Sequence, residues 1–545
     1  MKIALAQLNL CVGDLAGNTT RIIEHIARAR DQLGARVVAF PELAVTGYPP
    51  EDLLFRPGLH RRVEYALRQI ATASRGIAVV LGYPEAADGR VYNSLCVLED
   101  GHLAARYRKQ RLPNYQVFDE KRYFEAGTSA GVYRVDGISL GFSICEDIWD
   151  PATAESARVA GAEVILNINA SPWSQHKREA RQQAVGRAVA AAGLPVLYLN
   201  LVGGQDELVF DGGSFALDDG GHLRARAPEF TESLLEVELR REDGGIALSG
   251  DCAPPLDEEA AVYEALVLGV RDYVQKNRFA GAVLGLSGGI DSALTLAIAA
   301  DALGPENVTA ISMPSRYTAG MSVDDALAQA RAMGCECHVV SIEPTMQAFD
   351  ASLAPVFAGR GADVTEENIQ ARCRGILLMA YSNKTGRMVL TTGNKSEMAV
   401  GYATLYGDMA GGFAPLKDCP KTLVFRLSRW RNAQSASPVI PPRVIERPPS
   451  AELRPDQKDT DSLPPYDVLD PILEQYVEGD RTPQEIAAKG FDLDTVKRVA
   501  RMVDRNEYKR RQAAPGVRIT ERAFGRDRRF PITSRYDEQE PVPAP

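Results

Sequence analysis

Three residues suited to cleaving an amide bond lie at the ends of apolar segments in the first part of the chain. They are Glu42, Lys109 and Cys145. A thiolate can attack an amide, a carboxylate can take the thiol proton and return it to departing ammonia, and a lysine can stabilise the oxyanion. Because the ends of buried strands can meet at one edge of a sheet, this set predicts amide hydrolysis through a thioester, with all three residues catalytic.

Each member of this set also has a plain structural interpretation. A single Glu after a proline, a single Lys or a single Cys more often serves the fold than a reaction, so the three gain meaning together. Glu120, within the segment 118–124, is a further carboxylate that could assist them.

A second kind of chemistry is indicated by a glycine-rich loop that follows the apolar run 280–284. Its residues are Gly285, Leu286, Ser287, Gly288, Gly289, Ile290, Asp291 and Ser292. The glycines let backbone N–H groups approach an anion, the serines add donors, and the helix that follows presents its positive end, which together predict phosphate binding. Asp291 would repel phosphate unless a cation lies between them, so it indicates Mg²⁺. The loop lacks the Gly-Lys-Ser/Thr ending of a Walker loop.

Two other interpretations apply to residues in and near this loop. Residues 285–289 also fit the nucleophile elbow G-x-S-x-G, which needs a downstream histidine, and His338 is the one that remains. The run 335–338, Cys-Glu-Cys-His, suggests a metal site, although no second cluster completes four ligands. We expect Cys337 and His338 to begin a buried strand instead.

Composition limits the class of protein. The 545 residues exceed the size of one hydrophobic core, so two or three domains are expected. The formal net charge of −10 argues against nucleic-acid binding, and no stretch approaches the roughly 20 apolar residues of a membrane span. Eight scattered cysteines do not suggest a disulfide framework and favour a reducing cytoplasm. The start of the chain reads as an alternating strand rather than a signal peptide.

Short apolar runs alternate with helical patterns over residues 1–242, which predicts a layered α/β domain. Strands are expected at 37–40, 77–82, 94–98, 139–144, 164–168 and 196–201, and helices at 22–33 and 178–192. Glycines and prolines around 243–255 predict a linker. We therefore divide the chain into a first domain at 1–245, a linker at 246–258 and a second domain at 259–545.

The second domain has the pattern of a doubly wound, mostly parallel sheet, which would bind ligands at the carboxyl ends of its strands. Strands are expected at 282–286, 308–313, 337–342 and 388–392, and helices at 292–303, 324–333 and 366–383. Gly304 is expected to cap the first of these helices. Residues 435–465 are crowded with prolines and charges, and composition does not decide between a loop and a partly disordered lid.

Two motifs resemble known superfamilies. The context of Cys145, Ser-Ile-Cys-Glu-Asp at 143–147, resembles the nitrilase or carbon–nitrogen hydrolase superfamily. The Glu-Lys-Cys triad of that superfamily matches Glu42, Lys109 and Cys145 one for one, and it implies an N-terminal αββα sandwich. The loop at 285–292 resembles that of the ATP pyrophosphatases, which cleave ATP between the α- and β-phosphates to make an adenylate. That resemblance implies a C-terminal Rossmann-like domain of the adenine nucleotide hydrolase type.

Further motifs resemble one family of ligases nearly from end to end. They lie at 203–212, 313–318, 365–372, 391–397, 509–512 and 526–532. These segments resemble the glutamine-dependent NAD⁺ synthetases, whereas GMP and asparagine synthetases use glutaminase domains without a Glu-Lys-Cys set. The resemblance implies hydrolysis of L-glutamine and use of the ammonia with ATP to amidate deamido-NAD⁺ through an adenylate. The products would be NAD⁺, AMP and pyrophosphate.

The same resemblance implies roles for individual residues. Glutamine would be bound by Tyr115, Ser171 and Lys177. ATP would be bound by residues 285–292 and Thr392. Deamido-NAD⁺ would be bound by Asn368, Arg372, Glu397 and Lys509. Mg²⁺ would be shared by Asp291 and Glu397.

Two points in this assignment stay open. Asn368 and Arg372 lie four apart on one helix face and are also compatible with a solvated stripe. Leu405 stands where the ammonia-only synthetases often carry a lysine, and Lys417 or Lys421 could provide that charge.

The expected partners are small molecules, with no nucleic acid and no membrane, in a cytoplasmic protein. A homo-oligomer is implied by the resemblance alone. Because ammonia is mostly protonated and unreactive at neutral pH, a closed passage between the two sites is the natural hypothesis. A rival from another class is a glutamine or nucleotide sensor built on inactive enzyme domains. Cys145→Ala distinguishes the enzyme from the sensor. In the enzyme it should abolish glutamine-driven turnover, whereas in a sensor it should leave ligand binding largely intact.

Overall fold

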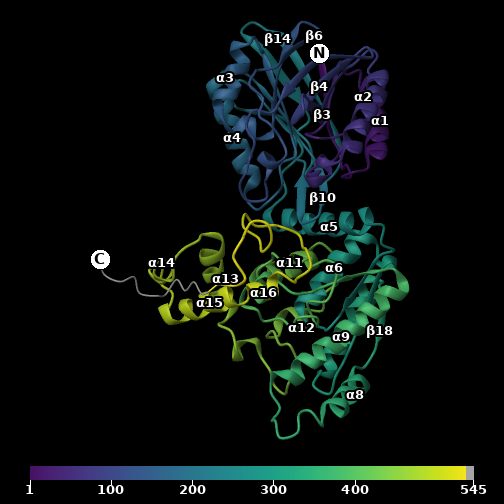
Figure 1. Cartoon of the computed structure of the whole chain (residues 1–545), viewed down its shortest axis with the longest axis vertical. Coiled ribbons are helices and arrows are strands. Elements are labelled where there is room, and N and C mark those ends of the chain that lie inside the picture. Colours follow the sequence, from purple (N-terminus) through teal and green to yellow (C-terminus); the bar gives the residue numbers. More distant parts are fainter. Residues whose placement is uncertain (535–545) are drawn as a thin grey trace. The chain divides into compact units, whose positions relative to one another are not determined.

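The computed structural model describes residues 1–534 and divides the chain into two compact units. The first is Met1–Asp257, and the second begins at Glu258. Figure 1 traces the helices and strands of each unit along the chain. Each unit has its own sheets and its own buried core.

The larger sheet of the first unit has seven strands, in the order β15-β14-β1-β2-β3-β4-β5. Its parallel centre is formed by β1 (Lys2–Gln7), β2 (Val37–Ala39) and β3 (Ala78–Ala87). Helices α1 (Leu15–Asp31) and α2 (Pro57–Ala73) connect these strands. Antiparallel strands extend both sides, namely β4 (Arg90–Glu99), β5 (His102–Arg108), β14 (Ser233–Glu242) and β15 (Gly245–Gly250).

The second sheet of this unit has six strands, in the order β13-β12-β9-β8-β7-β6. Its parallel centre is β7 (Ile138–Ile144), β8 (Val164–Asn169) and β9 (Val196–Asn200), connected by α3 (Pro151–Val159) and α4 (Lys177–Ala192). The antiparallel strands are β6 (Val132–Val135), β12 (Phe215–Leu217) and β13 (Leu223–Arg226). A separate hairpin is formed by β10 (Val202–Gln205) and β11 (Leu208–Asp211).

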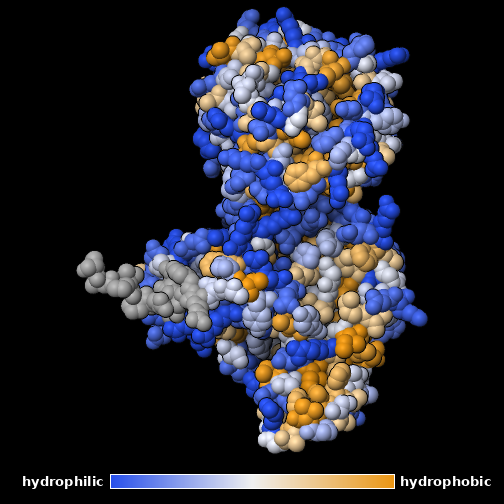
Figure 2. Space-filling model, viewed as in Figure 1, coloured by the Kyte–Doolittle hydropathy of each residue, from blue (hydrophilic) through white to orange (hydrophobic). Residues whose placement is uncertain are grey.

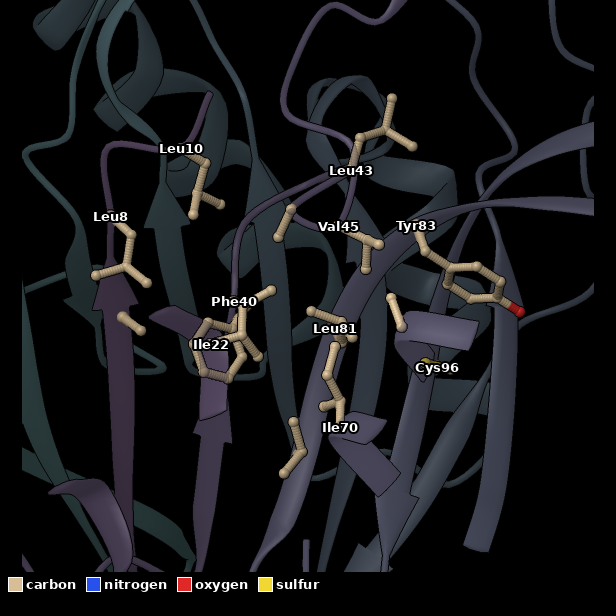
Figure 3. Packing of buried hydrophobic residues seen from close by; sticks show 14 of the residues in the cluster. Leu8, Leu10, Ile22, Phe40, Leu43, Val45, Ile70, Leu81, Tyr83 and Cys96 are labelled. Carbon is tan, nitrogen blue, oxygen red and sulfur yellow. The ribbon is translucent and has the colours of Figure 1, made fainter. Parts of the chain in front are cut away.

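The alternation of side chains along the strands builds four layers. In β2, Val37 belongs to the same core as Leu166 of β8, whereas Val38 belongs to a core shared with Ile22 of α1. Ile165 of β8 packs in a third core with α3 and α4. Two sheets therefore face each other and helices cover both outer faces, which confirms the αββα sandwich. Figure 3 shows part of the core between the first sheet and its helices.

The predicted linker at 246–258 is contradicted in its first part. β15 pairs antiparallel with β14, and Ile246 and Leu248 are buried in the core between the two sheets. The alternation from Ile246 to Leu248 is a short strand signal that the neighbouring glycines obscured. Helix α5 (Glu258–Lys276) begins where the linker was expected to end.

The second unit has a four-stranded parallel sheet, in the order β18-β17-β16-β19. The strands are β16 (Ala282–Gly285), β17 (Val308–Ser312), β18 (Glu336–Val339) and β19 (Met388–Leu390). The chain moves outward from β16 to β18 and then returns to the other side of β16 with β19. The order therefore reverses at the end of β16, which is the position where doubly wound sheets bind ligands. The doubly wound prediction is confirmed.

Helices surround this sheet. Those that connect its strands are α6 (Ile290–Leu303), α7 (Gly320–Met333), α8 (Glu343–Leu353) and α9 (Val364–Thr385). Gly304 caps α6, as predicted. After β19 come α10 (Lys395–Val400), α11 (Lys421–Ala433), α12 (Pro442–Glu446), α13 (Tyr466–Leu473), α14 (Pro483–Ala487), α15 (Leu493–Arg505) and α16 (Glu507–Arg510). Helices α10, α13 and α15 share a separate apolar core.

Two expectations for this unit are resolved by the packing. The strand expected to be buried at 337–342 is instead the short edge strand β18, and Val339 is 49% exposed, because an edge strand has a neighbour on one side only. The segment 435–465 is an ordered connection that contains α12 and a 3₁₀ turn at Asp459–Asp461. Within residues 1–534, no helix is both long and apolar enough to cross a bilayer.

Candidate active sites

In the first unit, Lys109 lies at the centre of a buried ion cluster. Its Nζ donates to Glu42 Oε1 at 2.7 Å and to Glu120 Oε1 at 2.9 Å, and no part of the Lys109 or Glu42 side chain is exposed. Asn93 Nδ2 donates to the same oxygen of Glu42 at 2.7 Å, and the N–H of Ala170 donates to the other oxygen at 2.9 Å. The Glu42 carboxylate is therefore held at both oxygens.

Cys145 follows β7 directly, in strained backbone. Its φ of +46° lies in the left-handed region, which costs a residue with a side chain about 1–3 kcal/mol and is common at functional sites. Asp147, in the same turn, is buried and accepts the N–H groups of Ile144 at 3.0 Å and Arg111 at 2.7 Å. It thereby joins the turn that carries Cys145 to the segment that carries Lys109.

Burial controls how this cluster titrates. It raises the pKa of the Cys145 thiol well above its usual range, and Glu42 adds to this effect while Lys109 opposes it. Burial also raises the pKa of Glu120 to about 7, against the opposing effect of Lys109. Burial alone would lower the pKa of Lys109, but the carboxylates of Glu120 and Glu42 raise it. The thiol therefore stays protonated until a base takes its proton, which is the situation that general base catalysis addresses.

One of the three predicted glutamine-binding residues lines a cavity of about 520 Å³, and a second contacts a residue of its wall. Tyr115 lines it, and its hydroxyl donates to the Glu146 carboxylate at 2.9 Å. Trp149 also lines it, and the Nζ of Lys177 lies 4.8 Å from the centre of the Trp149 ring. A cavity with an aromatic wall, a carboxylate and a nearby ammonium suits a small zwitterion.

Ser171 does not line that cavity. It follows Ala170, whose N–H binds Glu42, and its Oγ accepts from Arg181 Nε at 3.2 Å. Arg181 is itself buried, and its Nη1 donates to both oxygens of the Asp211 carboxylate, at 2.7 and 2.8 Å. This pair fixes the backbone around Ser171 beside the Glu42 carboxylate.

In the second unit, the loop between β16 and α6 makes a tight turn. Gly288 has a φ of +80°, and a Cβ there would lie 2.2 Å from the carbonyl oxygen of Ser322, so only glycine fits. Ser292 Oγ accepts the N–H of Ser287 at 3.2 Å, and Ser287 Oγ accepts the N–H of Gly289 at 3.1 Å. The two serines that were predicted as phosphate donors therefore also brace the loop.

Asp291 and Glu397 come together on one ammonium group. Lys421 Nζ donates to Asp291 Oδ2 and, at 3.3 Å, to Glu397 Oε1, while Asn394 Nδ2 donates to Asp291 Oδ1 at 2.9 Å. Burial raises the pKa of Glu397 to about 8, with Lys421 opposing and Asp291 adding to the rise. Two carboxylates directed at one cation form a donor set that also fits Mg²⁺, which takes one or two carboxylates together with substrate phosphates.

One cavity of about 310 Å³ gathers most of the predicted ATP residues. It is lined by Gly285, Leu286, Ser287, Gly289, Ile290, Asp291, Ser292 and Thr392. Gly288 of the same loop is turned against α7, at Ser322. Glu397, Lys417 and Lys421 also line the cavity, so both lysines proposed to replace a charge at Leu405 are present there.

The remaining residues predicted to bind deamido-NAD⁺ converge on the segment 401–405 rather than on the cavity itself. Asn368 Oδ1 accepts a threonine hydroxyl of this segment at 2.9 Å, and Arg372 Nε donates to the carbonyl of Leu405 at 3.2 Å. Lys509 Nζ donates to two carbonyls of the segment, each at 2.8 Å. Asn368 and Arg372 both contact this segment, so they are more than solvent-exposed residues on one helix face.

The nucleophile-elbow interpretation is excluded by the sheet order. Gly285 is in register with Ile311, and Ile311 with His338, so two strand spacings, about 10 Å in all, separate the loop from the histidine. A ring nitrogen of His338 instead lies 3.2 Å from Glu336. For residues 335–338, no group of three His, Cys, Asp or Glu side chains in the described part of the chain is placed to hold a metal ion.

Several residues of the first site were not predicted from the sequence. Asn93 and Arg181 lie inside a strand and a helix with no local pattern that marks them. Asp147 belongs to the cysteine motif, so its position beside Cys145 was a signal that could have revealed its positioning role. From the sequence, Glu120 was a carboxylate that could assist the other three residues, and in the structure it accepts a hydrogen bond from Lys109.

Two family models cover most of the chain. The carbon-nitrogen hydrolase family matches residues 2–245, and the NAD synthase family matches residues 262–513. The fold and the two sites therefore define a class of protein in which a carbon–nitrogen hydrolase and an NAD synthase share one chain.

Individual relatives narrow this class. The chain is 51% identical to a glutamine-dependent NAD(+) synthetase of Xanthomonas campestris pv. campestris, over 99% of this chain and 98% of the relative. It is 50% identical to that of Acinetobacter baylyi, over 98% of both. The solved structure of the glutamine-dependent NAD⁺ synthetase from Acinetobacter baumannii in complex with ADP is 47% identical, covers 97% of this chain and 98% of its own, and has a TM-score of 0.80. The chain belongs to the glutamine-dependent NAD⁺ synthetases.

Proposed function

We propose that the first unit hydrolyses L-glutamine to glutamate and ammonia, and that the second unit uses this ammonia with ATP to amidate deamido-NAD⁺. The observation that carries the proposal is the pairing of Glu42 with Lys109, both close enough to shift the pKa of the strained Cys145. The second unit adds a cavity lined by the glycine-rich loop, where Lys421 binds the carboxylates of Asp291 and Glu397. Membership in the family and the ADP bound by the Acinetobacter baumannii relative support the use of ATP.

In the first unit, Glu42 would take the proton of Cys145, and the thiolate would attack the side-chain amide of glutamine. Lys109 would stabilise the oxyanion, an effect worth about 3 kcal/mol or more. Glu42 would return the proton to the departing ammonia, and water would then hydrolyse the thioester. Tyr115, Ser171 and Lys177 would bind the rest of glutamine; Tyr115 lines the cavity beside Trp149, and Lys177 contacts the Trp149 ring.

In the second unit, residues 285–292 and Thr392 would bind ATP, and Asp291 with Glu397 would hold Mg²⁺, which offsets charge on the phosphates. The carboxylate of deamido-NAD⁺ would attack the α-phosphate, pyrophosphate would leave, and ammonia would displace AMP to give NAD⁺. Deamido-NAD⁺ would be bound by Asn368, Arg372 and Lys509. These residues hydrogen-bond to the segment 401–405, which would form part of the same binding site.

The location and assembly of the protein remain predictions. A cytoplasmic protein that acts on small molecules is consistent with the composition, and a homo-oligomer is implied by the family resemblance. Figure 2 shows apolar side chains gathered over the end of the second unit that carries α8. Exposed apolar residues of the second unit include Val339, Phe349, Val356 and Ile376. Exposed apolar patches often mark surfaces where proteins associate. A closed passage for ammonia between the sites also remains a proposal.

The test is product analysis with the wild-type chain, ATP, Mg²⁺ and deamido-NAD⁺, with either glutamine or ammonium as nitrogen donor. We expect NAD⁺, AMP and pyrophosphate with both donors. When glutamine is the donor, we also expect glutamate in an amount equal to the NAD⁺ formed. Glutamine that supports synthesis no better than an equal steady level of ammonia would contradict the closed passage. If neither donor gives NAD⁺, the assignment of deamido-NAD⁺ as substrate is wrong.

A further inference from the structure

The segment from Arg443 to Leu453 is tied down at both ends beside the nucleotide cavity. The guanidinium of Arg443 forms a bidentate ion pair with Asp325 of α7, at 2.8 and 3.1 Å. At the other end, Gln370 of α9 donates to the carbonyl of Leu453 at 2.9 Å. The residues between these anchors form part of the cavity wall.

Arg447, between the two anchors, touches the phosphate-binding loop itself. Its Nη2 donates to the carbonyl of Gly288, and its Nη1 donates to Ser322 Oγ at 2.9 Å. Glu452 binds the same hydroxyl at 2.7 Å and lies 3.8 Å from Arg447, which leaves the guanidinium only loosely paired. These two hydrogen bonds use two of the five N–H groups of the guanidinium.

The other cations of the cavity have different hydrogen-bond partners. Among the described residues, the cationic side chains that line it are Arg374, Lys417, Lys421 and Arg447. Lys421 is held by the carboxylates of Asp291 and Glu397. Arg374 and Lys417 donate to backbone carbonyls outside the loop, at 3.1 and 2.8 Å. Arg447 hydrogen-bonds to the glycine turn itself, at the carbonyl of Gly288.

We propose that Arg447 binds the β- and γ-phosphates of ATP, and the inorganic pyrophosphate that they become. This inference rests on the proposed use of ATP by the same cavity. A planar guanidinium binds phosphate oxygens through parallel N–H groups, and it keeps its charge at every relevant pH. The anchors at Arg443 and Leu453 hold this group against the loop before any ligand arrives, so little side-chain entropy remains to be lost on binding.

The chemical step explains why a cation is needed at this place. An oxygen of the deamido-NAD⁺ carboxylate forms a bond to the α-phosphorus while the bond from that phosphorus to the bridging oxygen of the β-phosphate breaks. The electron pair of the broken bond leaves with pyrophosphate, so negative charge grows on the β- and γ-phosphates. Hydrogen bonds from Arg447 that strengthen with this charge stabilise the leaving group.

The experiment compares Arg447→Met and Arg447→Lys in the full chain, with ammonium as nitrogen donor so that the first unit is not required. The measured quantities are the KM for ATP and the inhibition constant of inorganic pyrophosphate in the presence of Mg²⁺. We expect both to rise about 10- to 100-fold in Arg447→Met, the range of a lost charge-assisted hydrogen bond, and less in Arg447→Lys. The KM for deamido-NAD⁺ should change less than about twofold, because the proposal places Arg447 on the phosphates alone.

Arg454→Met is the matched control, because it removes an equal charge next to the same segment, from an exposed ion pair with Asp461 outside the cavity lining. It should leave the inhibition constant of pyrophosphate within about threefold of wild type. If Arg447→Met lowers the melting temperature but binds pyrophosphate as wild type does, Arg447 only fastens the segment and the inference is wrong.

Direct calorimetric titration of inorganic pyrophosphate into the wild type and the three variants separates this inference from the proposed function. A wild type that binds pyrophosphate through Arg447 but forms no NAD⁺ contradicts the proposed function and supports the inference. A wild type that forms NAD⁺ while Arg447→Met binds pyrophosphate unchanged contradicts the inference alone.

Discussion

The two sites place the same set of charges, one lysine ammonium and two carboxylates, in different surroundings. In the first unit, Lys109 lies between Glu42 and Glu120 in a buried cluster, and both carboxylates hydrogen-bond to its ammonium. In the second unit, Lys421 holds Asp291 and Glu397 in the wall of a cavity that more distant segments also line. An uncharged amide group can react beside ion pairs that stay intact. ATP with Mg²⁺ is charged, so its binding would replace the ion pairs that Lys421 makes with Asp291 and Glu397. The first site is therefore preorganised, and the second is held in place until its substrate arrives.

The difference also lies in which elements carry the residues. Glu42, Lys109 and Cys145 all follow strands of one rigid sandwich. The second site takes residues from the loop after β16, from α10 and α11, and from the irregular segment around Arg447. Sites on strand ends keep their geometry, whereas sites on connecting segments can adjust to ligands.

The largest expected effect separates the two sites completely. Cys145→Ala should reduce glutamine-driven NAD⁺ formation by about 10⁴-fold or more, because no other group replaces the nucleophile, and should leave ammonium-driven formation near wild type. Steady-state assays with each donor measure this. Cys252→Ala is the control, since Cys252 is an exposed cysteine of the same unit. Equal loss with both donors would show that the first site is needed for more than ammonia.

The next largest expected effect is a loss of activity at the second site. Asp291→Asn should lower synthesis with either donor by about 100- to 1,000-fold, because one of the two carboxylates proposed for Mg²⁺ is lost. The apparent affinity for Mg²⁺, measured from the metal dependence of ammonium-driven synthesis, should weaken in parallel. The exposed Asp324→Asn serves as the control. Unchanged Mg²⁺ dependence in Asp291→Asn would contradict the metal assignment.

A smaller effect tests preorganisation of the first site. Asn93→Ala removes a 2.7 Å hydrogen bond to Glu42, so glutamine hydrolysis should fall about tenfold while ammonium-driven synthesis is unchanged. Asn18→Ala, at another buried asparagine of this unit, should lower the melting temperature without this selective loss. If both variants reduce glutamine hydrolysis equally, Asn93 supports the fold and not the orientation of Glu42.

The last prediction concerns the pH dependence of stability rather than of activity. Glu120 releases its proton at its usual pKa of 4.5 in the unfolded chain, but burial raises its pKa to about 7 in the folded protein. The folded state therefore binds more protons between these values, and the free energy of unfolding falls as the pH rises through this window. Between pH 5 and 8, wild type should lose up to about 3 kcal/mol that Glu120→Gln does not lose. Urea denaturation at both pH values measures this.

The control for this pH effect is Glu125→Gln, at an exposed glutamate five residues further along the chain. It should follow the wild-type pH dependence. A Glu120→Gln variant that also follows it would mean that Glu120 stays ionised on Lys109 throughout this range.

Much of the fold was accessible from local patterns. The alternation in strands such as β2 and β8 and the glycine loop that opens α6 were visible without any tertiary information, because the periods of strands and helices are local properties. The strand β15 was missed because its alternation is short and flanked by glycines. The exposure of β18 could not be predicted, since whether a strand lies at an edge depends on the order of the whole sheet.

The sequence by itself determined which chemical groups this protein has: the Glu-Lys-Cys set, the phosphate loop and the division into two units. Only the tertiary structure decided which groups meet. It placed Glu120 and Asn93 on the Glu42–Lys109 pair, Lys421 between Asp291 and Glu397, and Arg447 on the glycine turn. These contacts join residues that lie far apart along the chain, and their positions follow from packing of the whole fold, which no local pattern encodes.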